Sequence, residues 1–389
     1  MMDLSSGSAG SAGRYCALRG ITELTPEQLT AGLDFRLPQH RRAVFLRAYE
    51  FHLQYGTMPG CVYFLFPWLT THYGWTQEQK LWFAFLNGNT QNPVTSWLIF
   101  RQFPAVDGLD EFELGRWFEA QYARLEFDTD RRYHKKNFLR AVAGYRLMIG
   151  RGTQQTLFDG ITQSSDEKEN YRLLWVRMKS FYSFGRLSMF SYSEYLRIMG
   201  LPIECDQLFL DDLEGSKSHR NGLCKVLGRD DLDWHDSNPA FTGYSQDVLQ
   251  WLREEGALLL QEARERFAGQ PYAANVSYET LESQLCNYKS WYRPNRRYPN
   301  VYTDMLYGRI RRAEKLWGES LDLFWQARRE SLPQHLRLED TPSDPGVHPI
   351  KQNHYRLTGE VIMMDRDWPC FTNRYNQAVP SSGLDHFSL

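Results

Sequence analysis

One segment combines side chains suited to acid–base chemistry with side chains suited to holding phosphate. LDDLEGSKSHRNGLCKVLG, residues 210–228, places carboxylates ahead of a histidine and a set of hydrogen-bond donors. A carboxylate beside a histidine can act as a general base or bind a metal, and hydroxyl, ammonium and guanidinium groups donate to phosphate. We therefore predict two groups here: catalytic residues His219, Asp211 and Asp212, and phosphate-binding residues Lys217, Ser218, Arg220 and Asn221. The alternative is a solvated, charge-balanced turn that caps the next helix.

The two aspartates also make Mg²⁺ a candidate cofactor, and the sequence indicates no other. The metal, if one is used, cannot be named from these residues alone, because carboxylates also serve as bases without any metal.

A second segment, LNGNTQNPVTSW at residues 86–97, is rich in amide side chains. Amides present both donors and acceptors, so they can read the edge of a nucleobase. The predicted base-binding residues are Asn87, Asn89, Gln91 and Asn92, with Trp82 stacking on the base. The alternative is a loop in which Gly88 and the asparagines supply turn conformations and Asn92-Pro93 begins a helix.

The third segment, KSWYRPNRRYP at residues 289–299, interleaves cations with aromatic rings; we call it the basic–aromatic segment. Arginine contacts phosphate bidentately, and rings stack on unpaired bases. DNA or RNA phosphate contacts are therefore predicted for Lys289, Arg293, Arg296 and Arg297. In the alternative interpretation, acidic residues such as Glu282 neutralise these cations at a surface between helices.

Composition limits the possible partners and compartments. The 389 residues carry 45 basic and 47 acidic side chains, so the net charge is −2 and an anionic partner must meet a local patch. None of the six cysteines forms a C-x-x-C pair, which favours reduced thiols over zinc or redox motifs. The longest apolar run, residues 61–69, is too short to span a membrane, and the first residues resemble no secretory signal. We therefore expect a soluble intracellular protein.

Helical periodicity dominates from about residue 25 to 330. Thr25-Pro26-Glu27-Gln28 is a helix start, and Thr76 with Gln79 forms a capping box. Helices are expected near 41–55, 110–125, 134–149, 167–184, 190–199, 245–268, 277–291 and 301–330. The fold class is therefore all-α. Polar stretches interrupt the helices at 150–170 and 203–244, where long functional loops are expected.

These patterns suggest four parts along the chain. Residues 1–14 form a Ser/Gly-rich disordered tail, and 15–150 form an N-terminal helical lobe. Residues 171–335 form a C-terminal helical lobe that carries the basic–aromatic segment, and 336–389 form an irregular, Pro- and Asp-rich tail.

Four stretches together resemble a known family. YEFHLQYGTMPGCVYFLFPWL, WTQEQKLWFAFLNGNTQNPVTSWLIFRQFP, SHRNGL and LESQLCNYKSWYRPNRRYPNVYTDML are similar to the bacteriophage amino acid:DNA transferases, also called α-glutamyl/putrescinyl thymine pyrophosphorylases. The resemblance covers about residues 30 to 330. It implies an all-helical architecture like that of the helix-hairpin-helix DNA glycosylases. MGLPIECDQLF, residues 199–209, departs from that pattern because it lacks the G-x-G turn of a hairpin.

The resemblance implies a specific reaction. The enzyme would transfer an amine or amino acid onto 5-(pyrophosphoryloxymethyl)uracil in DNA, release pyrophosphate, and act on a base flipped out of the helix. Its partners would be double-stranded phage DNA carrying the pyrophosphorylated base and a free amino acid or polyamine, with no membrane. Its location would be the cytoplasm of the infected bacterial host. The competing interpretations are a glycosylase-like base-excision enzyme and a non-catalytic DNA-binding protein.

Overall fold

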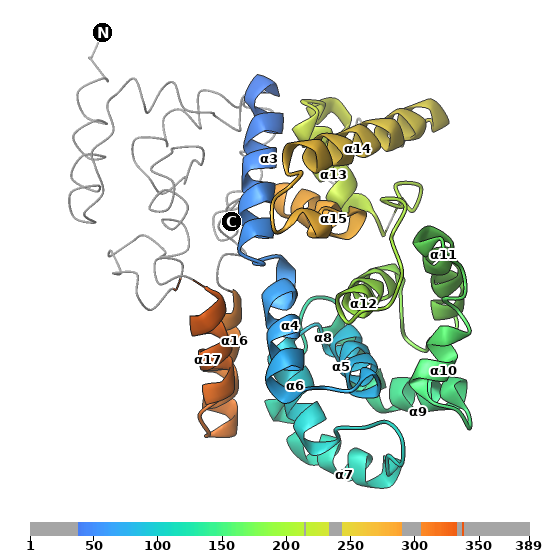
Figure 1. Cartoon of the computed structure of the whole chain (residues 1–389), viewed down its shortest axis with the longest axis vertical. Helices are drawn as coiled ribbons and strands as arrows, with labels where there is room; N and C mark the ends of the chain where they lie inside the picture. The colour runs from blue at the N-terminus through green and yellow to red at the C-terminus, as the bar shows by residue number, and fades with distance from the viewer. Residues whose placement is uncertain (1–37, 214, 233–242, 290–304, 333–336, 338–389) are drawn as a thin grey trace, which may run out of the picture.

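The computed structural model describes residues 38–213, 215–232, 243–289, 305–332 and 337 (Figure 1). Within these ranges the chain is built from helices and contains no strand, which confirms the predicted all-α class. The helices are α3 (Pro38–Gln54), α4 (Val62–Tyr73), α5 (Gln77–Thr90), α6 (Pro93–Gln102), α7 (Glu111–Gln121), α8 (Arg131–His134), α9 (Phe138–Ile149), α10 (Gln154–Asp159), α11 (Glu167–Met178), α12 (Arg186–Ile198), α13 (Lys217–Val226), α14 (Gln246–Arg266), α15 (Tyr278–Tyr288), α16 (Met305–Trp317) and α17 (Asp322–Ser331). The glycosylase-like relationship stays a prediction.

Local signals account for several helix boundaries. The capping box predicted at Thr76 is present: the Thr76 hydroxyl accepts from the Gln79 backbone N–H at 3.3 Å, and the Gln79 side chain accepts from the Thr76 N–H at 3.0 Å. Where one long helix was expected over 301–330, two helices are found, because Gly318 takes a left-handed conformation with φ 67° and ends α16. The predicted loop at 150–170 contains the short helix α10.

Two apolar clusters hold the described helices together. The first core joins α4–α7 and α9–α12 with α16 and α17, and the second core joins α3 with α13, α14 and α15. Figure 1 shows α3 and α13–α15 gathered on one side and α4–α11 on the other. The cores do not follow the order of the chain. Helix α3 packs with α13–α15, which come much later in the sequence, while α16 and α17 pack with helices of the first half. The lobe boundaries predicted from the sequence stay a prediction, and residues 1–14 and nearly all of 336–389 lie outside the described ranges.

Helix α12 lies at the boundary between the two cores. It packs against α5 and α4 of the first core, and it also contacts α15 of the second. Helices α13 and α15 cross closely at Gly222, where an added Cβ would lie 2.0 Å from the Leu285 carbonyl oxygen. The three helices α12, α13 and α15 are thereby fixed relative to one another. In the described ranges, no helix is both long and apolar enough to cross a membrane.

Candidate active site

Charged side chains are buried where α12, α13 and α15 meet. We call this group the charged layer, and its members are Arg186, Glu194 and Arg197 of α12, His219 of α13, and Glu279 and Glu282 of α15. The three carboxylates and the histidine are at most 6% exposed. Because an isolated buried charge is very costly, such a layer is stable only when its members pair with one another.

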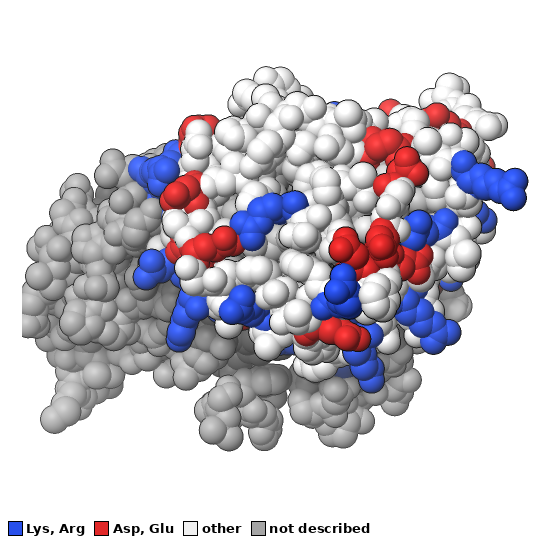
Figure 2. All heavy atoms as spheres, turned by 90° about the horizontal axis from the view of Figure 1, so that it is seen from below, with Lys and Arg blue, Asp and Glu red and all other residues white. Residues whose placement is uncertain are grey.

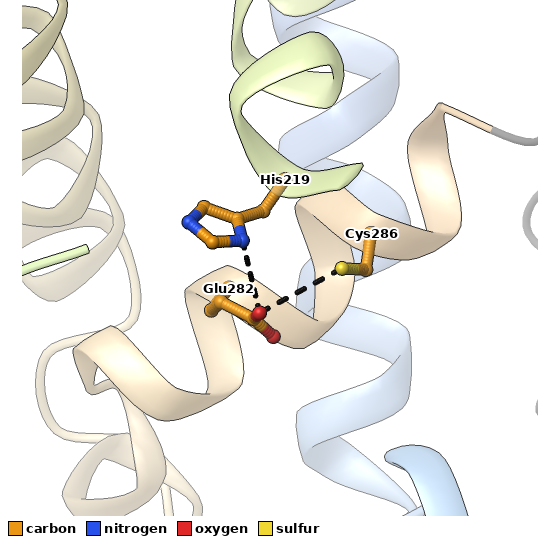
Figure 3. A group of neighbouring side chains, drawn as sticks. All are labelled: His219, Glu282 and Cys286. Carbon is orange, nitrogen blue, oxygen red and sulfur yellow. Dashed lines mark hydrogen bonds and ion pairs between the residues drawn. The ribbon is translucent and has the colours of Figure 1, made fainter. Parts of the chain in front are cut away.

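His219 and Glu282 form the central pair (Figure 3). The His219 Nδ1 atom lies 2.9 Å from Glu282 Oε1, and its Nε2 atom lies 2.7 Å from the Leu208 carbonyl oxygen. Both ring nitrogens therefore lie within hydrogen-bond distance of an oxygen atom. Burial raises the pKa of Glu282, but the charges of His219 and Arg186 outweigh burial and hold that pKa below its usual value. The pair is thus a buried histidine facing a carboxylate.

This geometry bears on the predicted general base. Both ring nitrogens of His219 are engaged by groups of the protein, Nδ1 by Glu282 and Arg186 and Nε2 by the Leu208 carbonyl oxygen. The role of His219 as a base stays a prediction that requires one of these contacts to open. Its position beside Arg186 suits stabilisation of an anion.

Cys286 completes a group of three possible metal ligands. Its Sγ atom lies 3.7 Å from Glu282 Oε1, and the ligand atoms of His219, Glu282 and Cys286 all lie within 4.8 Å of one another (Figure 3). Burial is the main cause that raises the pKa of the Cys286 thiol, so it stays protonated at neutral pH. Arg186 Nη2 lies 3.3 Å from both Glu282 Oε1 and His219 Nδ1, where it already supplies the positive charge. The arrangement therefore favours a proton-bearing ion pair over a metal centre.

A second cluster in the charged layer contains a carboxyl group that holds a proton. The Tyr63 hydroxyl donates to Glu194 at 2.7 Å and accepts from Arg197 at 3.0 Å, while Arg197 Nε lies 3.6 Å from Glu279. Burial raises the pKa of Glu194 to about 8. Glu194 is thus mostly neutral at pH 7, whereas Glu282 is charged. Environments that separate the pKa values of neighbouring carboxyl groups are typical of acid–base sites.

The predicted aspartates do not converge on one point. Asp211 is exposed and pairs with Arg253, whereas Asp212 accepts from the Gly215 N–H at 2.9 Å and lies 3.6 Å from Arg186 Nε. Their carboxylates thus engage two different arginines. The Mg²⁺ prediction gains no support from this arrangement and stays a prediction.

The predicted phosphate-binding residues of 210–228 divide into two groups. Arg220 is fully buried and donates to the carbonyl oxygens of Leu210, Asp212 and Leu213, and Asn221 is also buried. Lys217 and Ser218 are half-buried in the first turn of α13, and the Ser218 hydroxyl accepts from Lys289. Arg220 therefore holds the loop ahead of α13, while Ser218 lies beside the charged layer.

The amide segment lies in the first core. The Asn92 side chain caps α6 by accepting from the Val94 and Thr95 N–H groups, as the alternative interpretation expected. Hydrogen bonds within the protein also engage the side chains of the other predicted residues: Asn87 with Ser96, Asn89 with Phe85 and Arg131, Gln91 with Ser191, and Trp82 with Phe103. All five are at most 6% exposed. Base contact by these residues stays a prediction, and it would require these bonds to open.

Of the predicted cations in the basic–aromatic segment, only Lys289 lies within the described residues. It follows α15 directly, and its ammonium group donates to Ser218, so it contacts the first turn of α13. Arg293, Arg296 and Arg297 lie outside the described residues, and their predicted role is unchanged.

Reasoning from the sequence missed most of the charged layer. Arg186, Glu194, Arg197 and Glu279 of the layer, and Cys286 beside it, were not singled out, and Glu282 was considered only as a neutralising group. One signal was present: α15 reads TLESQLCN over residues 280–287, and its polar residues cover all of the helix except the side formed by Leu281 and Leu285. A short helix that is polar over most of its surface and also buried must pair its polar groups with neighbouring elements.

Comparison with known proteins supports an enzyme that acts on DNA. A family model described as amino acid:DNA transferase matches residues 46–297, which include the whole charged layer. A curated protein of Salmonella phage ViI, described as a serinyltransferase, is 27% identical over 293 residues; the alignment covers 72% of this chain and 71% of that protein. No solved structure matches the chain.

Proposed function

This chain belongs to the amino acid:DNA transferase family, and we propose that it transfers an amino acid or amine onto 5-(pyrophosphoryloxymethyl)uracil in DNA. The similarity to a phage protein described as a serinyltransferase supports a small amino acid as co-substrate and phage DNA as acceptor. In this reaction the bond between the 5-methylene carbon and the pyrophosphate oxygen breaks, and its electron pair leaves with pyrophosphate. The amine nitrogen then forms a bond to the same carbon and loses one proton.

The buried charged layer is the observation that carries this proposal. A departing pyrophosphate needs positioned cations, and Arg186 is such a cation, with its Nη2 atom 3.3 Å from His219 Nδ1. The amine must lose a proton, and the layer contains the Glu282 carboxylate and the protonated Glu194. Because these groups are buried, a base inside duplex DNA could meet them only after flipping out of the helix, which is why we propose flipping.

Exclusion of water is the second requirement. Departure of pyrophosphate leaves an electron-poor carbon that water, at about 55 M, could capture in place of the amine. The burial of the layer's carboxylates and of His219 suits this requirement.

The proposal is tested by incubating the full chain with DNA that carries pyrophosphorylated hydroxymethyluracil, together with serine, other amino acids and polyamines. Nucleoside mass spectrometry should detect one aminated thymine, and inorganic pyrophosphate should appear in equal amount. Release of a free base would instead indicate a glycosylase, and hydroxymethyluracil formed equally with and without amine would indicate a hydrolase. DNA bearing unmodified thymine is the matched control and should stay unchanged.

A further inference from the structure

The first turn of α13 has the features of an anion-binding helix end. Ser216 occupies the N-cap position without capping the helix through its side chain, because its hydroxyl donates back to the Phe209 carbonyl at 2.6 Å. The first N–H groups of a helix have no partner within the helix, and the helix dipole places partial positive charge there. A helix end alone does not make a site, so a second observation must indicate a ligand.

Arg186 supplies that observation. Its side chain is only 9% exposed, and its Nη1 atom is buried without a hydrogen-bond partner. The guanidinium lies against the chain that enters α13, since a Cβ added at Gly215 would lie 2.9 Å from Arg186 Nε. A buried donor without an acceptor is costly, so this N–H group indicates an acceptor supplied from outside the protein.

Lys289 brings a second cation to the same place from a different helix. Its ammonium donates to the Ser218 hydroxyl in the first turn of α13. Lys289 and Arg186 both lie close enough to Cys286 to oppose the rise in its thiol pKa that burial causes. Two cations and a hydroxyl group therefore converge at the start of α13.

The carboxylates at this point are already engaged. Glu282 is occupied by His219 and Arg186, and Asp212 accepts from the Gly215 N–H. An anion that entered here would meet the cations Arg186 and Lys289 together with the end of the helix.

We propose that Arg186 is the central cation of a phosphate-binding site at the N-terminus of α13, completed by Ser218 and Lys289. The ligand is a phosphate group. This phosphate group belongs either to the pyrophosphate that the proposed reaction releases or to the DNA backbone. Both sources follow from the proposed function, on which this inference rests. Arg220, which the sequence suggested for this role, instead holds the backbone of the preceding loop.

The site is tested by isothermal titration of the full chain with inorganic pyrophosphate. Arg186→Gln should weaken pyrophosphate binding at least about tenfold, because it removes a charged hydrogen-bond donor, and Arg186→Lys should retain part of the affinity. Arg172→Gln is the matched control, since Arg172 is 53% exposed on α11 and pairs with Asp206. Pyrophosphate should bind this control as it binds the wild type.

A second measurement identifies the source of the phosphate. If the site takes the leaving group, Arg186→Gln should leave the salt dependence of DNA binding unchanged; if it takes a backbone phosphate, the slope should fall by about one unit. Normal binding of both pyrophosphate and DNA by folded Arg186→Gln would overturn the proposal.

Two further variants keep the test valid if Arg186→Gln fails to fold. Ser218→Ala and Lys289→Gln should each weaken pyrophosphate binding several-fold in protein whose circular dichroism is that of the wild type. Unchanged binding in both would overturn the site. The binding assay uses no transfer step, so amine transfer with unchanged pyrophosphate affinity would refute only this site. Binding dependent on Arg186 without any transfer would refute only the proposed function.

Discussion

Two buried carboxyl groups in the charged layer have pKa values displaced in opposite directions. His219 and Arg186 keep Glu282 ionised in spite of its burial, whereas burial raises the pKa of Glu194 to about 8. The neighbours explain the difference. Glu282 lies directly beside His219 and Arg186. Glu194 instead accepts from the neutral Tyr63 hydroxyl, and Arg197 donates to that hydroxyl. At neutral pH the layer therefore contains both a proton acceptor and a proton donor.

The pKa of Glu194 predicts how stability depends on pH. Between about pH 4.5 and pH 8 the folded protein keeps a proton on Glu194 that the unfolded chain has released, so the free energy of unfolding falls as pH rises through this window. Glu194→Gln keeps the shape and cannot ionise. It should match the wild type below pH 4.5 and exceed it by about 5 kcal/mol above pH 8. Urea unfolding at several pH values measures this difference.

The control for this prediction is Glu254→Gln, which changes an exposed carboxylate on α14. Its pH profile should run parallel to that of the wild type. If the profile of Glu194→Gln also ran parallel, Glu194 would ionise normally in the folded state, and its proposed part in proton transfer would be wrong.

Among the elements, the crossing of α13 and α15 positions the site. His219 and Glu282 meet because Gly222 allows the two helices to approach, and a Cβ at that position would lie 2.0 Å from the Leu285 carbonyl oxygen. That oxygen belongs to the helix backbone, so the clash cannot be relieved by a side-chain rotation. Gly222→Ala should lower the free energy of unfolding by about 3 kcal/mol and lower transfer activity as the pair separates.

Gly115→Ala is the matched control, because it lies within α7 and its added Cβ would meet only Leu139 at 4.0 Å. It should raise stability by about 0.5–1 kcal/mol, as alanine favours helix over glycine. Thermal and urea unfolding of the two variants should show changes in the free energy of unfolding of opposite sign. Equal stability of Gly222→Ala and the wild type would mean that the helices can move apart without cost.

The sequence was sufficient for most helices because their signals are local. The Thr76 capping box and the helix expected near 41–55 are each predicted from a few neighbouring residues, and the structure confirms both. The charged layer could not be predicted in this way. Arg186, His219 and Glu282 come from three helices widely separated along the chain, and their contact depends on helix crossings that no local pattern encodes. The partners of the amide segment could not be predicted for the same reason, since Asn89 bonds to Arg131 and Gln91 to Ser191 from distant parts of the chain.

For the whole molecule, the net charge is only −2. On the face seen from below, Figure 2 shows basic and acidic side chains of the described residues interspersed. DNA affinity depends on the number of phosphates that cations neutralise. A face of mixed sign contributes little to that number, so DNA binding should depend on a few clustered cations, as the basic–aromatic segment supplies.

Two sets of basic residues should therefore differ in their effect on the salt dependence of DNA binding. Changing Arg296 and Arg297 together to Gln should lower the slope of log affinity against log salt by about two units, if each contacts one phosphate. Changing Arg311 and Lys315 to Gln removes the same charge from the exposed surface of α16 and should leave the slope unchanged. Fluorescence anisotropy with duplex DNA over a range of salt concentrations measures both slopes. An equal fall of the slope in the two double variants would mean that DNA binding responds to the total charge of the protein. Contacts with individual phosphates would instead depend on where the charges lie.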